Sequence, residues 1–337
     1  MTDWHMRREI AEQPELLRRC APAWEARAQA LRAHLDARRQ WVLVGRGSSG
    51  NACTFAAYLQ GLRTGRHPIE LRPWIVTQEV PQADWSDTTA LVYSLSGEST
   101  DVAAAARWLR DRGAYVVGVT NAERPDCRLG EASDTLFHLG IGAEQAVPAT
   151  KSYCAQLVVS AALCGFPIVQ AAQEIAASIE ALLAPDGVTA VVDFLEQARV
   201  AVFIARGPAL AAALDAALKL QETAAQPSLA WSAAEYFHGP IRATSAEDRV
   251  VLLADTDEPL DSVQAVASAL LGRNVPFLRV GPRSQERADV LSLDMPQERW
   301  ARTPVLAALS QLVALALAER RGLDPDAPAG IQKITMT

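Results

Sequence analysis

The stretch V-L-V-G-R-G-S-S-G (residues 42–50) is echoed 160 residues later by V-F-I-A-R-G-P-A-L (202–210). Each copy has the pattern of a short apolar strand, a loop with Arg-Gly and small residues, and an Ala-rich helix. Units of this kind pack as a parallel sheet with helices on both of its faces. The echo therefore predicts a duplicated α/β unit.

Similar patterns alternate along the rest of the chain. Strands are predicted at 41–44, 90–93, 115–119, 201–205, 249–254 and 276–280. Helices are predicted at 50–62, 99–112, 150–163, 208–223, 261–272 and 303–320. The fold class that this order predicts is α/β, with mostly parallel sheets flanked by helices.

These patterns divide the chain into successive segments. A helical, arginine-rich lead-in over 1–39 precedes a first α/β domain over 40–170. A helical connector over 171–197 leads to a second domain over 198–325, and a short tail over 326–337 ends the sequence. The 337 residues are ample for two domains of ordinary size.

Composition and charge exclude several classes of function. The net charge of -7 argues against nucleic acid or an anionic membrane as the main partner. A signal peptide and a long uncharged run are both lacking, so no membrane span and a cytoplasmic location are predicted. Five cysteines without a C-x-x-C pair predict buried thiols in a reducing compartment. No metal-ligand spacing and no nicotinamide or flavin fingerprint occurs, so we expect neither a metal nor a cofactor.

Hydroxyl groups cluster in S-L-S-G-E-S-T (94–100), directly after a predicted strand. A loop at the carboxyl end of a parallel strand faces the ligand crevice, and the next helix points its free N–H groups there. Ser94, Ser96, Ser99 and Thr100 add neutral donors, so the loop suits a phosphate monoester. A serine turn with an N-cap would explain only one or two of these hydroxyls.

The other loops at strand ends sharpen this prediction. G-R-G-S-S-G-N (45–51) adds Ser48 and Ser49 at a second helix start, whereas D-T-D-E-P (255–259) in the second half would repel a phosphate. The P-loop sequence of nucleotide-binding proteins is absent. A lone sugar phosphate held by the first half is the ligand that fits best.

Lysine is rare in this chain. Of 32 basic residues only Lys151, Lys219 and Lys333 are lysines. A coding bias toward arginine explains the scarcity, but it would spare lysine mainly where an amine nucleophile or base is needed. Each lysine is therefore a candidate functional residue.

Six short motifs, in order, resemble those of the SIS (sugar isomerase) domain family. They are G-R-G-S-S, S-L-S-G-E-S, A-V-P-A-T-K-S (146–152), A-L-K-L-Q-E-T (217–223), A-A-E-Y-F-H-G-P (233–240) and A-G-I-Q-K-I-T (329–335). The chain looks like the isomerase half of glucosamine-6-phosphate synthase and the related stand-alone deaminases. This resemblance implies two tandem SIS domains, each a mostly parallel flavodoxin-like sheet.

The resemblance also implies catalytic roles. Glu222 would shuttle a proton between two sugar carbons, and Lys219, which shares its helix face, would assist at C2. A solvated salt bridge is the plain alternative for this pair. His238, in F-H-G-P, would open the sugar ring from the neighbouring subunit, which implies a homodimer. Lys333 would close over the sugar and form an imine, although it could also be a solubilising terminal lysine. Lys151 would support the sugar loop or pair with Glu144.

The family pattern places the sugar phosphate against two loops and one further position. Leu95 stands where the family often has glutamine, and Ala149 replaces a common serine, so the exact substrate is open. The implied substrate-binding residues are Gly47, Ser48, Ser49, Ser94, Leu95, Ser96, Ser99 and Ala149.

These residues support three hypotheses. The chain opens Met-Thr-Asp-Trp rather than with a glutaminase cysteine, so the first is an amino-sugar-phosphate isomerase that releases ammonia, converting glucosamine 6-phosphate to fructose 6-phosphate. The second is a fructosamine-6-phosphate deglycase, and the third is a non-catalytic sugar-phosphate sensor. A sensor would need the serine loops but not the candidate catalytic residues.

Overall fold

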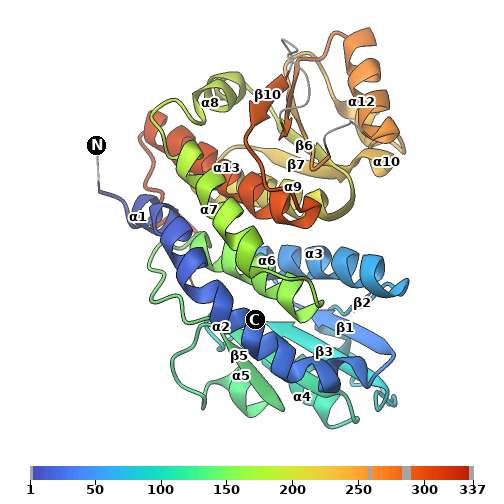
Figure 1. Cartoon of the computed structure of the whole chain (residues 1–337). Helices are drawn as coiled ribbons and strands as arrows, with labels where there is room; N and C mark the ends of the chain where they lie inside the picture. The colour runs from blue at the N-terminus through green and yellow to red at the C-terminus, as the bar shows by residue number, and fades with distance from the viewer. Residues whose placement is uncertain (1–2, 257–259, 283–289, 334–337) are drawn as a thin grey trace. The chain divides into compact units, whose positions relative to one another are not determined.

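Two parallel five-stranded sheets flanked by helices form the protein (Figure 1). The structure is a computed structural model that describes residues 3–256, 260–282 and 290–333. Contacts divide these residues into two units. The first-sheet unit contains Arg19–Glu144, Lys151–Val169 and the tail residues Gln332 and Lys333, and the second-sheet unit contains the rest. The five segments predicted from the sequence stay a prediction about domains.

The first sheet has the strand order β2-β1-β3-β4-β5, with every neighbouring pair parallel. Its central strands are buried apolar runs, as expected for strands covered on both faces. Helices α3 and α4 pack against strands β1, β3 and β4. The strands are β1 (Gln40–Val44), β2 (Ile69–Glu70), β3 (Thr88–Tyr93), β4 (Tyr115–Thr120) and β5 (Thr135–His138), and the helices are α3 (Gly47–Thr64), η1 (Ile75–Glu79), α4 (Thr100–Arg110), α5 (Arg128–Glu131) and α6 (Lys151–Leu163).

The second sheet repeats this scheme with the order β10-β9-β8-β6-β7, again all parallel. Helix α9 packs against β6 and β7, and α13 packs against α9. The strands are β6 (Ala201–Ala205), β7 (Ser228–Ser232), β8 (Arg249–Leu253), β9 (Phe277–Pro282) and β10 (Val290–Leu293), and the helices are η2 (Gly207–Ala209), α9 (Leu210–Ala224), α10 (Ala233–Tyr236), α11 (Pro240–Ala243), α12 (Asp261–Gly272) and α13 (Arg299–Arg320). The predicted class of two tandem flavodoxin-like domains is confirmed.

Helices also fill the predicted lead-in and connector: α1 (His5–Ala11), α2 (Gln13–Asp36), α7 (Val169–Leu182) and α8 (Thr189–Glu196). The expectation that no run could span a membrane overlooked helix α13, which is long and apolar enough to do so, but 89% of its most apolar stretch is buried inside the protein. This is the burial of a core helix. None of the five cysteines, all of which lie within the described residues, forms a disulfide, and all are buried except Cys20, which is half-buried.

The strands that sequence reasoning missed are the outer ones of each sheet: β2, β5, β7 and β10. A strand at an edge or near it lacks the apolar run that burial on both faces requires. In β2, both residues are exposed, and in β7 Leu229 is 48% exposed. The pattern that predicts central strands is therefore absent from these four.

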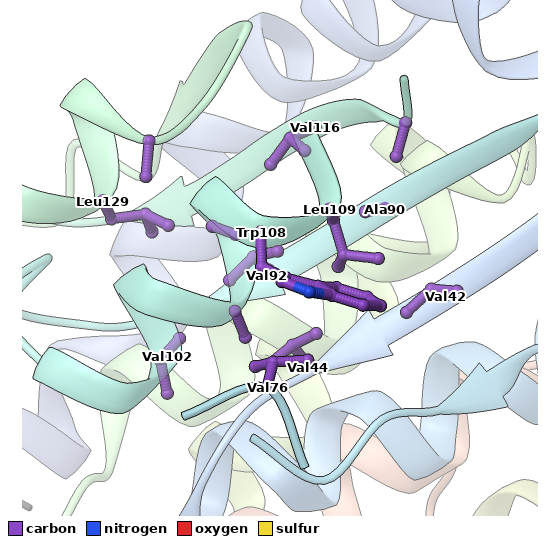
Figure 2. Packing of buried hydrophobic residues seen from close by; sticks show 14 of the residues in the cluster. Val42, Val44, Val76, Ala90, Val92, Val102, Trp108, Leu109, Val116 and Leu129 are labelled. Atoms are coloured by element: carbon purple, nitrogen blue, oxygen red, sulfur yellow. The ribbon is translucent and has the colours of Figure 1, made fainter. Parts of the chain in front are cut away.

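Trp108 fills the core between α4 and the first sheet (Figure 2). Its indole Nε1 donates to the Pro81 carbonyl oxygen at 3.2 Å, and its ring meets that of Trp85 edge to face at 5.9 Å. Val76, from the π-helical turn η1, packs into the same cluster. Trp108 thus links α4, the segment around η1 and the sheet, whereas the nearby Trp74 is 60% exposed.

Replacing Trp108 with alanine should lower the free energy of unfolding by about 3–5 kcal/mol, because the cavity cannot be refilled by its neighbours. Urea unfolding followed by far-ultraviolet circular dichroism measures this change. Trp74→Ala is the matched control and should change the unfolding free energy by no more than about 0.5 kcal/mol. Equal losses from the two variants would contradict the packing role given to Trp108.

Candidate active site

The strand order of the first sheet reverses between β1 and β3. The chain runs from β1 outward to β2 and then returns to β3 on the other side. Ligands of such sheets bind at this switch point, outside the carboxyl ends of the two strands. Val44 pairs with Val92 in the parallel register, so the loops after β1 and β3 start side by side. These loops are the two hydroxyl-rich segments singled out in the sequence.

The loop after β3 is held by hydrogen bonds to its backbone from residues at the end of β4. The Leu95 carbonyl accepts hydrogen bonds from the Asn121 N–H at 3.0 Å and the Thr120 hydroxyl at 3.2 Å. Gly97 has φ +72°, and a Cβ there would lie 2.6 Å from the Cys127 sulfur, so the position requires glycine. The loop geometry is therefore fixed before any ligand arrives.

The hydroxyls of this loop have distinct partners. Ser94 is 4% exposed and donates to the Ser99 hydroxyl at 3.2 Å, and the Ser96 hydroxyl accepts from the Glu98 N–H at 3.2 Å. Ser99 occupies the N-cap position of α4, but its side chain makes no capping hydrogen bond. The serine turn that the sequence offered as an alternative is present at Ser96, and it does not involve the hydroxyls of Ser94 and Ser99.

The loop after β1 brings a second helix start to the same edge. Gly47 has φ +53° and is the first residue of α3, and it is followed by the buried Ser48 and by Ser49. Arg46 donates to Asp101 in the first turn of α4 at 2.8 Å, which ties the two loops together. The guanidinium also balances the carboxylate, so two positive helix ends can face an anion there.

Lys333 joins the first-sheet unit through a buried carboxylate. Its amine lies 2.9 Å from the Glu144 carboxylate, whose side chain is 1% exposed while that of Lys333 is 27% exposed. Glu144 also accepts from the backbone N–H and the hydroxyl of Ser152, at 3.0 and 2.7 Å. Ser152 lies in the first turn of α6, next to Lys151, which is 3% exposed. The tail lysine is thus fixed against the protein.

Lys219 and Glu222 form an ion pair on α9 in the second-sheet unit. Lys219 is 1% exposed and Asp215, one turn earlier, is fully buried, whereas the Glu222 side chain is 24% exposed. The alternative of a solvated surface bridge is therefore wrong for Lys219. A buried cation is held where water cannot hydrate it, which is costly unless a partner or a function requires it.

His238 lies on the exposed turn between α10 and α11. Gly239 follows with φ +139°, and Pro240 begins α11. Among the described residues, no recorded hydrogen bond or ion pair joins the imidazole to Lys219 or Glu222. Phe237, beside it, is 42% exposed.

The second switch point lies between β6 and β8 and differs from the first. Gly207 has φ +63°, like Gly47, but the carboxylate of Asp255 lies here, after β8. Asp255 is 2% exposed, and its carboxylate accepts hydrogen bonds from Nε and Nη2 of the Arg299 guanidinium at 3.0 and 3.1 Å. A side chain of the protein itself thus supplies an anion. The remaining acidic residues of the predicted repulsive loop, Asp257 and Glu258, lie outside the described residues.

The structure separates the predicted site residues into two groups. Gly47, Ser48, Ser49, Ser94, Leu95, Ser96, Ser99 and Lys333 belong to the first-sheet unit. Lys219, Glu222, His238 and Ala149 belong to the second-sheet unit. Sequence reasoning missed Arg46 and Asp101, although both flank predicted loop residues, and it missed Lys333 as the partner of Glu144. Within the described residues, no group of three or more His, Cys, Asp or Glu side chains could hold a metal ion.

Comparisons with known proteins give a consistent picture. The SIS domain profile matches residues 34–164 and 194–280, more than half of the chain. Glutamine–fructose-6-phosphate aminotransferase (isomerizing) of Pyrobaculum aerophilum is 28% identical over 97% of this chain and 56% of its own length. The chain spans about half the length of the curated relatives it matches.

Two solved structures share the fold. The C-terminal domain of glucosamine-fructose-6-phosphate aminotransferase from Francisella tularensis has a TM-score of 0.85 at 22% identity, over 97% of this chain and 99% of its own. Glucosamine-6-phosphate deaminase from Thermotoga maritima has a TM-score of 0.78 at 22% identity, over 99% of this chain and 100% of its own. At this identity the likeness shows the fold alone.

The buried Asp255 predicts a pH dependence of stability. Burial raises its pKa, and the hydrogen bond and charge of Arg299 lower it by less. A carboxyl with a raised pKa in the folded state stabilises the fold when protonated, and this contribution is lost as the pH rises through that pKa. Asp255→Asn should therefore gain stability relative to the native protein between about pH 4 and pH 7.

Thermal unfolding at several pH values measures this difference. Asp84→Asn is a control of opposite sign, because the Ser86 N–H lowers the pKa of Asp84. It should lose stability relative to the native protein only as the pH rises to about 4, and its relative stability should stay constant from about pH 5 to pH 7. A relative loss for Asp255→Asn as the pH rises would contradict the dominance of burial at Asp255.

Proposed function

Because the chain belongs to the SIS domain family, we propose that it is an aldose–ketose isomerase of amino sugar 6-phosphates that releases ammonia. The substrate would be glucosamine 6-phosphate, and the products fructose 6-phosphate and ammonia, with one water consumed. The single observation that carries the proposal is the ion pair of the buried Lys219 with the partly exposed Glu222, on the helix that follows the second Arg-Gly loop. No metal or cofactor is needed for this chemistry.

The phosphate of the substrate would bind at the switch point of the first sheet. Two helix starts, α3 and α4, and the hydroxyls of the loops after β1 and β3 support this placement. A phosphate dianion is stabilised by helix N-termini and by neutral donors that need no rearrangement. Arg46 would not contribute a net charge, since Asp101 already balances it.

Glu222 would move the proton between C1 and C2 of the open-chain sugar. Its carboxylate is partly exposed, so a substrate can reach it, while Lys219 behind it is buried. A carboxylate fixed by a buried ammonium returns to the same position after each transfer. Lys219 would assist at C2 through the Glu222 carboxylate that it holds.

Lys333 would bind the open-chain ketose as an imine. Its side chain is 27% exposed, and its amine is held by Glu144, which offers an acceptor for the proton that the ammonium must lose before the amine attacks a carbonyl. Glu144 would return that proton to the carbonyl oxygen, which leaves as water, so that the cationic imine has the restored carboxylate as its counter-ion. Water then hydrolyses the imine and restores the amine.

His238 would act in the site of a second subunit and open the sugar ring there. Its turn is exposed and carries the exposed aromatic ring of Phe237. An exposed aromatic group beside a polar one is typical of protein interfaces. A homodimer in which each site takes His238 from its neighbour is therefore part of the proposal.

The relatives support an amino sugar substrate without fixing the reaction. The curated ones are named glutamine–fructose-6-phosphate aminotransferases, and one solved structure of the same fold is named glucosamine-6-phosphate deaminase. Both names join fructose or glucosamine 6-phosphate to the transfer or release of an amino group. The release of ammonia is thus the activity to measure first.

A fructosamine-6-phosphate deglycase is the second candidate. Leu95 and Ala149 stand where related domains often carry polar side chains, so a larger substituent on the amine meets fewer polar groups. A sensor without catalysis is less well supported. Burying Lys219 with a carboxylate destabilises a fold more than an apolar pair would, and a protein that only binds has no use for it.

Glu222→Gln should abolish ammonia release from glucosamine 6-phosphate. Loss of a general base lowers kcat by about 10²–10⁴-fold, whereas the affinity for the sugar phosphate should stay within about threefold. A coupled ammonia assay gives kcat, and calorimetric titration gives the affinity.

The matched control is Glu247→Gln, an exposed carboxylate of the same unit, which should retain native activity. If Glu222→Gln leaves the rate of ammonia release unchanged, Glu222 is not the residue that moves the proton. A native protein that binds the sugar phosphate and releases no ammonia should then be assayed with fructosamine 6-phosphates. Activity on fructosamine 6-phosphates would establish the deglycase. A lack of activity on them would leave the non-catalytic sensor as the remaining hypothesis.

Subunit mixing tests the placement of His238. Homodimers of His238→Ala and of Glu222→Gln should both be inactive, but a mixed dimer contains one site with native Glu222 and native His238 when the histidine crosses the interface. Random exchange should restore about a quarter of native activity. A mixture that stays inactive after verified exchange of subunits would place His238 in the site of its own chain.

A further inference from the structure

A chain of buried hydrogen bonds lies behind the loop after β1. It runs from Tyr93, at the end of β3, through Ser160 and Gln156 on α6 to Ser49 on α3. Tyr93 and Ser160 are fully buried, and Gln156 is 2% exposed. The function proposed above uses Ser49 and leaves the other three residues without a role.

Because each hydroxyl group has only one hydrogen, the donor and the acceptor of the bond between Tyr93 and Ser160 can be assigned. The Ser160 hydroxyl donates its only hydrogen to the Gln156 backbone carbonyl at 2.6 Å. The Tyr93 hydroxyl, 2.8 Å from the Ser160 oxygen, must therefore be the donor between these two groups. Burial raises the pKa of Tyr93 well above its ordinary value, so the phenol keeps its proton. Helix α6 is thereby fixed against the end of β3.

At the outer end the Gln156 side chain meets the ligand loop. Its Nε2 donates to the Ser49 hydroxyl oxygen at 3.0 Å. A hydroxyl oxygen that accepts this bond still has its own hydrogen to donate. Within the part of the chain that the structure describes, no acceptor for that hydrogen is recorded, and Ser49 is half-buried in the first turn of α3.

We propose that Gln156 is a positioning residue that fixes the Ser49 hydroxyl as a hydrogen-bond donor toward the phosphate of the substrate. This inference rests on the phosphate site proposed above. A phosphate dianion carries acceptor oxygens only, so each hydroxyl that faces it must donate. Gln156 ensures this because its amide occupies the lone pair of Ser49 from behind.

A purely structural role for Gln156 would have a different consequence. If the amide only joined α6 to α3, its loss would lower stability and leave the phosphate affinity unchanged. Gln156→Glu separates the two roles, because a carboxylate of the same shape offers an acceptor where the amide offers a donor. Ser49 would then turn its hydrogen inward and present only lone pairs to the phosphate.

The test is calorimetric titration of the full-length protein with glucosamine 6-phosphate and, separately, with inorganic phosphate. Gln156→Glu should raise Kd for both probes by about tenfold to hundredfold, the usual effect of one hydrogen bond to a charged group. In steady-state assays KM should rise by a similar factor, with kcat changed less than about twofold. Gln156→Leu leaves Ser49 free to rotate, and Kd should rise by about threefold to tenfold.

A double-mutant cycle with Ser49→Ala isolates the coupling. In the Ser49→Ala background, Gln156→Leu should change Kd by less than about twofold, because no hydroxyl remains to orient, whereas the added charge of Gln156→Glu still repels the phosphate. Gln60→Leu replaces another buried glutamine of the same unit and should leave Kd unchanged. If Gln156→Glu does not fold, the cycle with Gln156→Leu still decides the question.

Each outcome has one interpretation. A native protein that binds neither probe overturns the proposed function and this inference together. If the native protein binds the probes, and Ser49→Ala weakens this binding while Gln156→Glu and Gln156→Leu do not, the inference is overturned and the proposed function stands. A loss of affinity from Gln156→Leu that persists unchanged in the Ser49→Ala background would also overturn the inference, since it would not pass through Ser49.

Discussion

The parallel pairing of β1 with β3 is the constraint on which the proposed ligand site depends. The register that places Val44 opposite Val92 ends both strands at one edge. Two loops and two helix starts therefore meet there, and the ion pair between Arg46 and Asp101 fixes their separation. The partial charges of the two helix ends then add, which neither strand–loop–helix unit achieves alone.

The second sheet uses the same strand order for a different purpose. Its switch point also has a glycine with positive φ after the first strand, but Asp255 and Arg299 occupy the region with a paired charge. Burial raises the pKa of Asp255, so the pair reduces stability near neutral pH relative to a neutral group. The two units thus share one topology and differ at the switch point, because the second unit supplies an anion of its own there.

The central strands, the long helices and the two hydroxyl loops could be predicted from the sequence, because each of these depends on residues close together in the chain. The edge strands could not be predicted, because they lack a continuous apolar run. Both residues of β2, for example, are exposed. Sequence reasoning also missed contacts between distant residues. Lys333 and Glu144 are 189 positions apart, and Gln156 and Ser49 are 107 apart. No local pattern encodes such pairs, so only the folded chain reveals that a buried carboxylate holds the tail lysine.

Neutral donors suit the phosphate better than free arginines for a catalyst that must release its product. An arginine that faces a phosphate without a counter-charge binds substrate and product equally tightly, and such binding lowers KM without raising kcat. In the first-sheet unit the nearby guanidinium of Arg46 is already engaged by Asp101. The phosphate would be held by hydroxyls and backbone N–H groups, each of them weak, so their orientation determines the affinity. The proposed hydrogen bond from the buried Gln156 to Ser49 would supply that orientation from inside the fold.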